Sequence, residues 1–399
     1  MSDSSNSSIG LSISSVDISS INSDSSTVSS DKSISSVSVS SGSVLSTSTG
    51  SKKFTISKKS DTSSNSIKSG SIKKLKITKK LVGKEKDVND MYKKMEHKKH
   101  IYEKPDTYVG ACEAEMTSTH IFEDEQVVND DGSQSSKKLS GRIVRKEVSY
   151  PPGWYKCFDE LIVNAHDHKK RMDKLIEDLG KKKHKHKPVT TIKVQIEDNG
   201  AITFFNDGDG IHVEFLKKHK MYPPELIFGT LLSSTNFDDG DQREWGGRNG
   251  YGAKLANIFG KLFRVETVDH FNGKKFVQEF SNNMNDKTVP KITSVAKANP
   301  YTKITWLPDY ERFGMSGMSD DIVNIIKKRV YDIAGVTDKK TKVYFNGKMV
   351  ECREFEKYVD LYIGPKSETK RAYEESLGWQ VVATSSEDEV FEQISFVNG

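Results

Sequence analysis

A glycine-rich stretch, Glu-Trp-Gly-Gly-Arg-Asn-Gly-Tyr-Gly-Ala-Lys, occupies residues 244–254. Four of its glycines fall within residues 246–252, although glycine adds no side chain to a core and costs backbone entropy. Glycines do let backbone N–H groups approach an anion closely. Apolar residues with helical spacing follow, so the stretch is expected to lead into a helix N-terminus, which favours phosphate. With the positive charges of Arg248 and Lys254, the stretch predicts a cradle for a nucleotide phosphate.

The stretch differs from two common phosphate-binding loops. The sequence has no G-x-x-x-x-G-K-[ST] motif, and Leu255 follows Lys254 where a magnesium-binding hydroxyl would stand. No apolar strand leads directly into the glycines, as a dinucleotide fingerprint requires. Acidic and polar residues precede them instead, which is typical of a mobile lid.

A second group of polar residues lies on a segment with helical periodicity. Glu160, Asn164 and Asp167 are spaced i, i+4, i+7, which places them along one face of a helix expected over 154–180. Apolar residues such as Leu161 and Ile162 occupy the other faces, which favours a pocket beside the polar face. On spacing alone, a solvated helix face explains the pattern equally well.

Two further positions could contact a flat base. Asn206 opens the run Asn-Asp-Gly-Asp-Gly after a predicted strand. An Asn there can accept from an exocyclic amine, and the glycines would let a base lie against the backbone; an acidic β-turn is the alternative. Thr305 lies inside another predicted strand, where its hydroxyl could bond a base-bound water or only its own sheet.

The elements that must position these residues are mostly strands. Period-2 alternation and turn signals predict the strands, and apolar residues at three- and four-residue spacing predict the helices. Asn346-Gly347 predicts the turn of a hairpin over 341–350. Residues 180–187 form a basic loop, in which lysines beside both histidines argue against a cation site. The expected helices are 154–180 and 320–334, and the expected strands are 191–196, 201–205, 261–268, 276–280, 291–296, 302–307, 379–383 and 391–397.

Composition limits the fold and the cellular setting. The 399 residues are 34% hydrophobic with a net charge of +5, enough for one large domain or two plus a tail. Residues 1–50 contain 24 serines and no aromatic residue, which predicts disorder. From Lys52 the tail becomes basic. This segment could be a solvated linker or an arm that touches DNA or RNA, and the sequence favours neither. Folded sequence is expected from Asp87.

The cysteines and the hydropathy pattern exclude two classes of protein. Cys112, Cys157 and Cys352 lie far apart without metal-ligand spacing, which indicates a reducing compartment and no disulfide framework. No run of about 18 apolar residues and no secretory signal is present. We therefore expect no membrane association.

Taken in chain order, these motifs resemble the GHKL (Bergerat) ATP-binding fold. Over about residues 90–399 the sequence more specifically resembles the amino-terminal ATPase region of eukaryotic-type DNA topoisomerase II. The stretches that carry this resemblance are Glu-Lys-Pro-Asp-Thr-Tyr-Val-Gly at 103–110, Tyr-Lys-Cys-Phe-Asp-Glu-Leu-Ile-Val-Asn-Ala at 155–165, Leu-Ile-Phe-Gly at 226–229, Gly-Gly-Arg-Asn-Gly-Tyr-Gly-Ala-Lys at 246–254, Tyr-Asp-Ile-Ala-Gly at 331–335 and Gln-Ile-Ser-Phe-Val-Asn at 393–398.

The resemblance implies ATP and Mg²⁺ as cofactors and a role for each matching residue. Glu160 matches the general base that activates the attacking water, Asn164 the ligand of Mg²⁺, and Asn206 the residue that reads the adenine amine. The run that contacts ribose and phosphate is matched by Ser234, Thr235 and Asn236, and the phosphate-binding lid by Gly247, Arg248, Asn249, Gly250, Tyr251, Gly252, Ala253 and Lys254.

The resemblance also implies the architecture and the partners. We expect an α/β sandwich whose mixed, mostly antiparallel sheet is covered on one face by helices. Residues 1–86 would be the tail, 87–352 the GHKL domain and 353–399 the start of a truncated transducer domain. Expected partners are duplex DNA, a second copy of the chain on ATP binding, and the remainder of the enzyme in cis or as a separate chain. The expected location is intracellular, in a nucleus or, for a viral enzyme, in host cytoplasm or virion.

One departure from the family pattern stands out. The family supplies a γ-phosphate-binding lysine from a transducer loop beyond the Ser-Phe-Val-Asn strand, and this sequence ends at Gly399, before that loop. The DNA-cleaving tyrosine and the acidic metal-binding domain are also missing, so we expect a portion of a larger enzyme. The alternatives are an ATP-dependent dimerisation clamp without its own topoisomerase activity, or a GHKL ATPase of the mismatch-repair or chaperone type.

Overall fold

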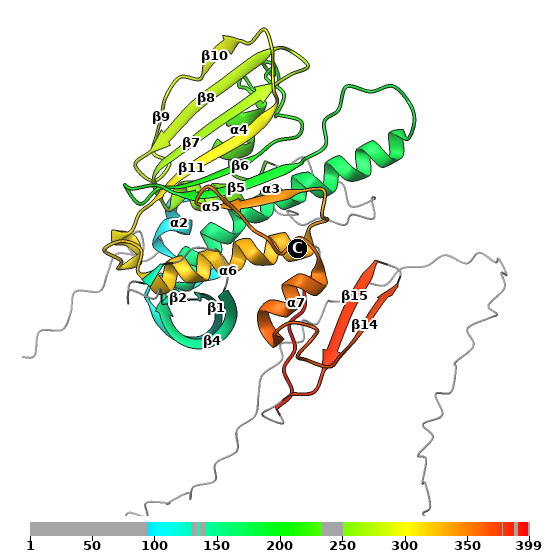
Figure 1. The fold of residues 1–399 in the computed structure, drawn as a ribbon. Coiled ribbons are helices and arrows are strands. Elements are labelled where there is room, and N and C mark those ends of the chain that lie inside the picture. The colour runs from blue at the N-terminus through cyan, green and yellow to red at the C-terminus, as the bar shows by residue number, and fades with distance from the viewer. Residues whose placement is uncertain are drawn as a thin grey trace, which may run out of the picture. The chain divides into compact units, whose positions relative to one another are not determined.

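A mixed β-sheet with helices on one face forms the main body of the fold (Figure 1). The computed structural model describes residues 94–125, 141–233, 250–376, 378–386 and 390–397, and two short strands, β2 (Val127–Val128) and β3 (Gln134–Ser135). The sheet order is β10-β8-β7-β11-β6-β5-β12-β13, with β9 paired to β8. Every pair is antiparallel except β5 with β12. Its strands are β5 (Thr191–Ile196), β6 (Ile202–Asn206), β7 (Gly260–Asp269), β8 (Lys274–Ser281), β9 (Asp286–Lys287), β10 (Lys291–Ser294), β11 (Tyr301–Pro308), β12 (Lys342–Phe345) and β13 (Lys348–Met349).

Strand alternation decides which side chains face the helices. In β6 the buried residues are Ile202, Phe204 and Asn206, and in β11 they include Ile304 and Trp306. Because successive side chains of a strand point to opposite faces, the residues between them lie on the other side of the sheet. This confirms the mixed, mostly antiparallel sheet predicted from the sequence, and it places Asn206 on the helix-covered side.

Helix α3 (Pro152–Leu179) lies along the covered face and carries much of the core. Trp154, Phe158 and Ile162 are fully buried at four-residue spacing. The helix begins at Pro152, where the absent N–H costs nothing, and it ends at Leu179, followed by Gly180 with a φ of 57°. The shorter helices α2 (His97–Glu103), α4 (Pro223–Gly229) and α5 (Gly252–Ile258) and the 3₁₀ turn η1 (Pro105–Thr107) complete this part of the chain.

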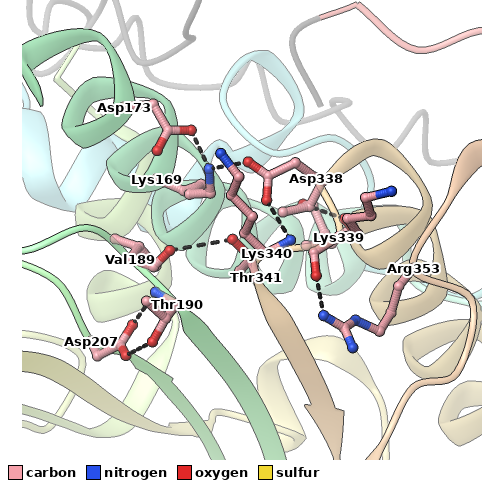
Figure 2. Close-up of polar contacts among 12 residues, drawn as sticks. Lys169, Asp173, Val189, Thr190, Asp207, Asp338, Lys339, Lys340, Thr341 and Arg353 are labelled. Atoms are coloured by element: carbon pink, nitrogen blue, oxygen red, sulfur yellow. Dashed lines mark hydrogen bonds and ion pairs between the residues drawn. The ribbon is translucent and has the colours of Figure 1, made fainter. Parts of the chain in front are cut away.

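Helix α6 (Asp320–Val336) packs against strand β12 of the sheet, helix α3 and the elements described next. Ser319 caps it by accepting from the backbone N–H of Ile322 at 3.4 Å. Beyond its C-terminus, Asp338 pairs with buried Lys169 of α3 at 2.8 Å (Figure 2). The other elements are the antiparallel hairpin of β1 (Glu115–Asp124) and β4 (Gly141–Tyr150), which packs on α6, then η2 (Glu311–Phe313), α7 (Phe355–Ile363), β14 (Arg371–Ser376) and β15 (Trp379–Thr384).

Most predicted elements are confirmed, and one is wrong. The hairpin turn has φ values of 46° at Asn346 and 76° at Gly347, as a type I′ turn requires. The strand expected at 391–397 is irregular instead, and none of the described strands pairs with it. Alternating apolar residues cannot form a strand without a partner for their backbone groups. The expected start of folded sequence, Asp87, lies outside the described residues.

The described helices include none that is long and apolar enough to span a membrane.

Candidate nucleotide-binding site

The polar face of α3 forms one wall of a cavity on the helix-covered side of the sheet. Glu160, Asn164 and Asp167 all line this cavity, which confirms that their spacing marks a pocket. The same face continues with His168 and Arg171, which the sequence analysis did not identify although they extend the i, i+4, i+7 series to i+8 and i+11.

Glu160 lies between its own helix and the glycine-rich segment. Its carboxylate pairs with Lys156 at 2.5 Å, one helical turn earlier, and its side chain is 25% exposed. Burial opposes the charge of Lys156, but the hydrogen bond and the charge of Glu160 raise the pKa of that lysine above its ordinary value. On the other side, a Cβ added to Gly252 would stand 2.0 Å from Glu160 Oε2. The carboxylate therefore fills the space that a side chain at Gly252 would need.

Asn164 is oriented by a bond to its own helix. Its Nδ2 donates to the carbonyl oxygen of Glu160 at 2.6 Å. With the nitrogen engaged, Oδ1 is the atom that can accept a hydrogen bond or ligate a hard cation. A single amide oxygen beside a phosphate site fits magnesium, which keeps most of its ligands from water and phosphate.

Asn206 ends β6 and is 6% exposed. Its Nδ2 donates to the carbonyl of Asp207 at 2.8 Å, so Oδ1 remains as the acceptor at the cavity that Asn206 lines. An acceptor there suits an exocyclic amine such as that of adenine.

The two glycines after Asn206 allow close packing within the protein. A Cβ at Gly208, whose φ is 92°, would lie 2.5 Å from Val189 Cγ2, and one at Gly210 would lie 1.9 Å from the carbonyl oxygen of Val268. These distances show a packing reason for both glycines, and the expectation that a base lies against this backbone stays a prediction. Both glycines let the turn pack on neighbouring strands.

The two carboxylates of this turn bind the chain that leads into β5. Asp207 accepts from the backbone N–H of Thr190 at 2.7 Å and from its hydroxyl at 2.5 Å (Figure 2). Asp209 contacts His186 Nδ1 at 2.6 Å and accepts from the N–H of Lys187 at 2.8 Å. Together they fix the turn that carries Asn206.

His168 supports the same turn from α3. Its Nε2 lies 2.8 Å from the carbonyl oxygen of Asp209. Burial lowers the pKa of His168 to about 4, so the ring is neutral at physiological pH. A neutral ring can still donate from Nε2 to that carbonyl.

The glycine-rich segment is described from Gly250 onward. The expectation of a helix after it is confirmed by α5, and Gly250, Gly252, Ala253 and Lys254 line the cavity. Tyr251 precedes the helix and packs against the core. The other proposed nucleotide contacts lie outside the described residues: Ser234, Thr235, Asn236, Gly247, Arg248 and Asn249.

Lys254 is nearly fully buried beside the cavity. Its Nζ donates to the carbonyl oxygens of Ser233 and Gly250, both at 2.5 Å. Burial lowers the pKa of Lys254 to about 8. The Lys254 ammonium thus links Ser233 to Gly250, the described residues that flank 234–249. The sequence alone did not reveal this role.

Thr305 does not face the cavity. Its hydroxyl lies 3.1 Å from that of Thr203, on the side of the sheet opposite Asn206, so it bonds its own sheet. The threonine that lines the cavity is Thr302, whose Oγ1 lies 3.2 Å from Thr267 Oγ1. Period-2 alternation from Asn206 and the antiparallel register could have identified it, because Thr302 is the register partner of Asn206.

The mixed sheet, the polar face of α3 and the glycine-rich entry to α5 together define the GHKL class of ATPase fold. The 41%-identical DNA topoisomerase 2 of Acanthamoeba polyphaga mimivirus aligns over 318 residues, 78% of this chain and 23% of the relative. The probable DNA topoisomerase 2 of Dictyostelium discoideum is 40% identical, over 79% of this chain and 19% of the relative. The chain therefore spans about a fifth of the length of these curated relatives.

Solved structures give the family. The ATPase region of Saccharomyces cerevisiae topoisomerase II matches with a TM-score of 0.64 and 37% identity, over 75% of this chain and 72% of that one. The ATPase and transducer domains of DNA topoisomerase II from Balamuthia mandrillaris match with a TM-score of 0.66 and 36% identity, over 78% and 73%. No family model matches the sequence. The chain belongs to the type II DNA topoisomerases and corresponds to their ATPase region.

Proposed function

We propose that this chain binds ATP·Mg²⁺ and hydrolyses it as the ATPase of a type II DNA topoisomerase. The observation that carries the proposal is the contact between Glu160 and Gly252. It sets a carboxylate, the group that can take a proton from water, against the backbone of the segment that receives the phosphates.

The polar residues proposed to act on the nucleotide have distinct tasks. Glu160 accepts the proton of the attacking water, and Lys156 holds its carboxylate through their ion pair. Asn164 presents Oδ1 to Mg²⁺, and Asn206 presents Oδ1 to the adenine amine. The glycine-rich residues 247–254 receive the phosphates through backbone N–H groups. Bound magnesium would offset the charge that develops on the transferred phosphoryl group.

In the whole enzyme, we propose that ATP binding closes two copies of this region into a gate for a DNA duplex. The relatives are named DNA topoisomerases, and strand passage would require the remainder of such an enzyme, in cis or as a separate chain. Residues 87–352 would form the GHKL domain and 353–399 the start of the transducer. The proposed DNA substrate would place the protein inside a cell, in a nucleus or, for a viral enzyme, in host cytoplasm or the virion.

The test of the ATPase proposal is Glu160→Gln. This change preserves size and hydrogen bonding but removes the base, so hydrolysis should fall by about 10²–10⁴-fold while ATP binding is retained. Single-turnover hydrolysis with the protein in excess and titration of a fluorescent ATP analogue measure the two quantities. Glu177→Gln, on an exposed position of the same helix, is the matched control. A parallel loss of binding and hydrolysis would assign Glu160 a structural role and reject the proposal.

A further inference from the structure

The loop between α3 and β5 carries a dense positive charge that the ATPase site does not use. Residues 181–187, Lys-Lys-Lys-His-Lys-His-Lys, are here called the basic strip. All five lysines of the strip are exposed, whereas His184 and His186 are half-buried. From 183 to 187 the chain therefore alternates lysine outward and histidine inward.

Three polar contacts hold the backbone of the strip on the protein. His186 Nδ1 lies 2.6 Å from Asp209 Oδ2, and the N–H of Lys187 donates to Asp209 Oδ1 at 2.8 Å. His270 Nε2 lies 3.0 Å from the carbonyl oxygen of Lys185. The His186 ring also packs edge-on against Phe271, with centroids 5.2 Å apart. His186 thus serves as an anchor of the strip.

The residues that follow extend this anchoring into the sheet. The carbonyl of Val189 accepts from the Thr341 hydroxyl at 3.2 Å, and Thr190 is bound by Asp207 (Figure 2). The chain just after the strip is therefore held by Thr341, which precedes β12, and by the turn that carries Asn206. A fixed strip presents its charges with less conformational entropy to lose on binding than a free tail would.

The lysine side chains of the strip have no anionic partner in the part of the chain that the structure describes. Among the described residues, no ion pair or side-chain hydrogen bond involves the ammonium group of any strip lysine. The Asp209 carboxylate, which contacts the strip, is engaged by the N–H of Lys187 and by His186. Five exposed like charges within seven residues attract a polyanion and repel one another in its absence.

We propose that the basic strip binds the phosphate backbone of duplex DNA. Lysine is a flexible point charge that contacts phosphate without reading bases, so the expected binding is independent of sequence. The strip contains no Phe, Tyr or Trp on which unpaired bases could stack, which favours a duplex over a single strand. The inference rests on the proposed function, in which the substrate is DNA, and it names a surface for that substrate.

The experiment compares three forms of the 399-residue chain in fluorescence anisotropy titrations with a labelled 30-base-pair duplex at several salt concentrations. The strip variant replaces all five strip lysines by Gln. The control variant replaces five exposed lysines outside the strip, none of which forms an ion pair with a described residue, and so has the same net charge. Its substitutions are Lys104→Gln, Lys297→Gln, Lys340→Gln, Lys342→Gln and Lys370→Gln. The basic segment before Asp87 is present in all three forms and cancels in the comparison.

Counterion release sets the expected result. Each phosphate contact contributes about 0.9 to the slope of log K against log salt, so the strip variant should lose up to about 4.5 from that slope. Its affinity should fall roughly tenfold or more at 100 mM salt, while the control changes little. In the unmodified protein, DNA should protect the strip lysines from acetylation, read by mass spectrometry, and leave the control lysines reactive. This second measurement needs no variant to fold.

The outcomes separate this inference from the proposed function. Equal affinity and equal salt slope for the strip and control variants, with no protection of the strip lysines, would reject DNA binding by the basic strip and leave the proposed function standing. Equal losses for duplex, single-stranded DNA and heparin would reject the duplex as its specific partner. Absence of duplex binding by the unmodified chain would count against DNA as its substrate, whereas Glu160→Gln hydrolysis tests the ATPase independently.

Discussion

Gly252→Ala tests whether the glycine-rich segment sets the position of the Glu160 carboxylate, the proposed general base. The new Cβ would stand 2.0 Å from Glu160 Oε2 and 3.0 Å from Glu160 Cδ. Ordinary contact begins at 3.4 Å, so the carboxylate oxygen would have to move by about 1.4 Å. Such a displacement is possible because it is at the free end of a side chain, but misplacing a catalytic group by about 1 Å can cost roughly 10²-fold in rate. We expect single-turnover ATP hydrolysis to fall by about 100-fold.

Stability should change little in this variant. Gly252 is the first residue of α5 and has no positive φ, so alanine fits the backbone and changes helix propensity by less than about 1 kcal/mol. Thermal unfolding and binding of an ATP analogue therefore serve as controls. This separates displacement of Glu160 from general unfolding.

A double-mutant cycle completes the test. If Gly252→Ala acts through the carboxylate, it should have little further effect on hydrolysis in a Glu160→Gln background, because contacting residues are not additive. Hydrolysis at the unmodified rate in Gly252→Ala, or the same fold-loss in both backgrounds, would refute the reasoning.

Two other predictions concern recognition of adenine by Asn206 and the buried lysine Lys254. Asn206→Leu removes the acceptor proposed for the adenine amine and should weaken ATP binding by roughly tenfold, measured by calorimetry. Equal affinity of the unmodified protein for ATP and GTP would contradict the proposed placement of adenine. Lys254 has a pKa of about 8 in the folded protein against an ordinary 10.5, so between these values the unfolded chain binds more protons and the free energy of unfolding rises with pH. The gain should be about 2 kcal/mol from pH 7.5 to 9.5 in urea titrations and should be absent in Lys254→Met, whereas equal slopes would show that Lys254 is not desolvated.

The local elements of the site were predictable because they depend on periodicity along the chain. The three- and four-residue spacing on α3 gave both its core face and the polar face of Glu160, Asn164 and Asp167. Alternation along β6 is enough to place Asn206 on the same side as the core residues Ile202 and Phe204. Such patterns are visible in sequence because each residue's direction follows from its neighbours.

Elements without a clear pattern were missed. In β1 only Ile121 and Phe122 are buried, so the strand lacks the alternation that would mark it, and pairing with β4 stabilises it instead. The reverse error occurred at residues 391–397, which alternate like a strand but have no partner strand among those described. Strand formation depends on pairing, which local pattern does not report.

The sequence by itself determined the class of fold and the residue types at the site, because both are written in spacing and motifs. Only the tertiary structure brought Glu160 against Gly252, 92 positions along the chain, and turned Thr302 rather than Thr305 toward the cavity. It also assigned Asp209 to anchoring the basic strip. These relations depend on how α3, α5 and the sheet pack together, and contacts between distant segments leave no trace in local periodicity.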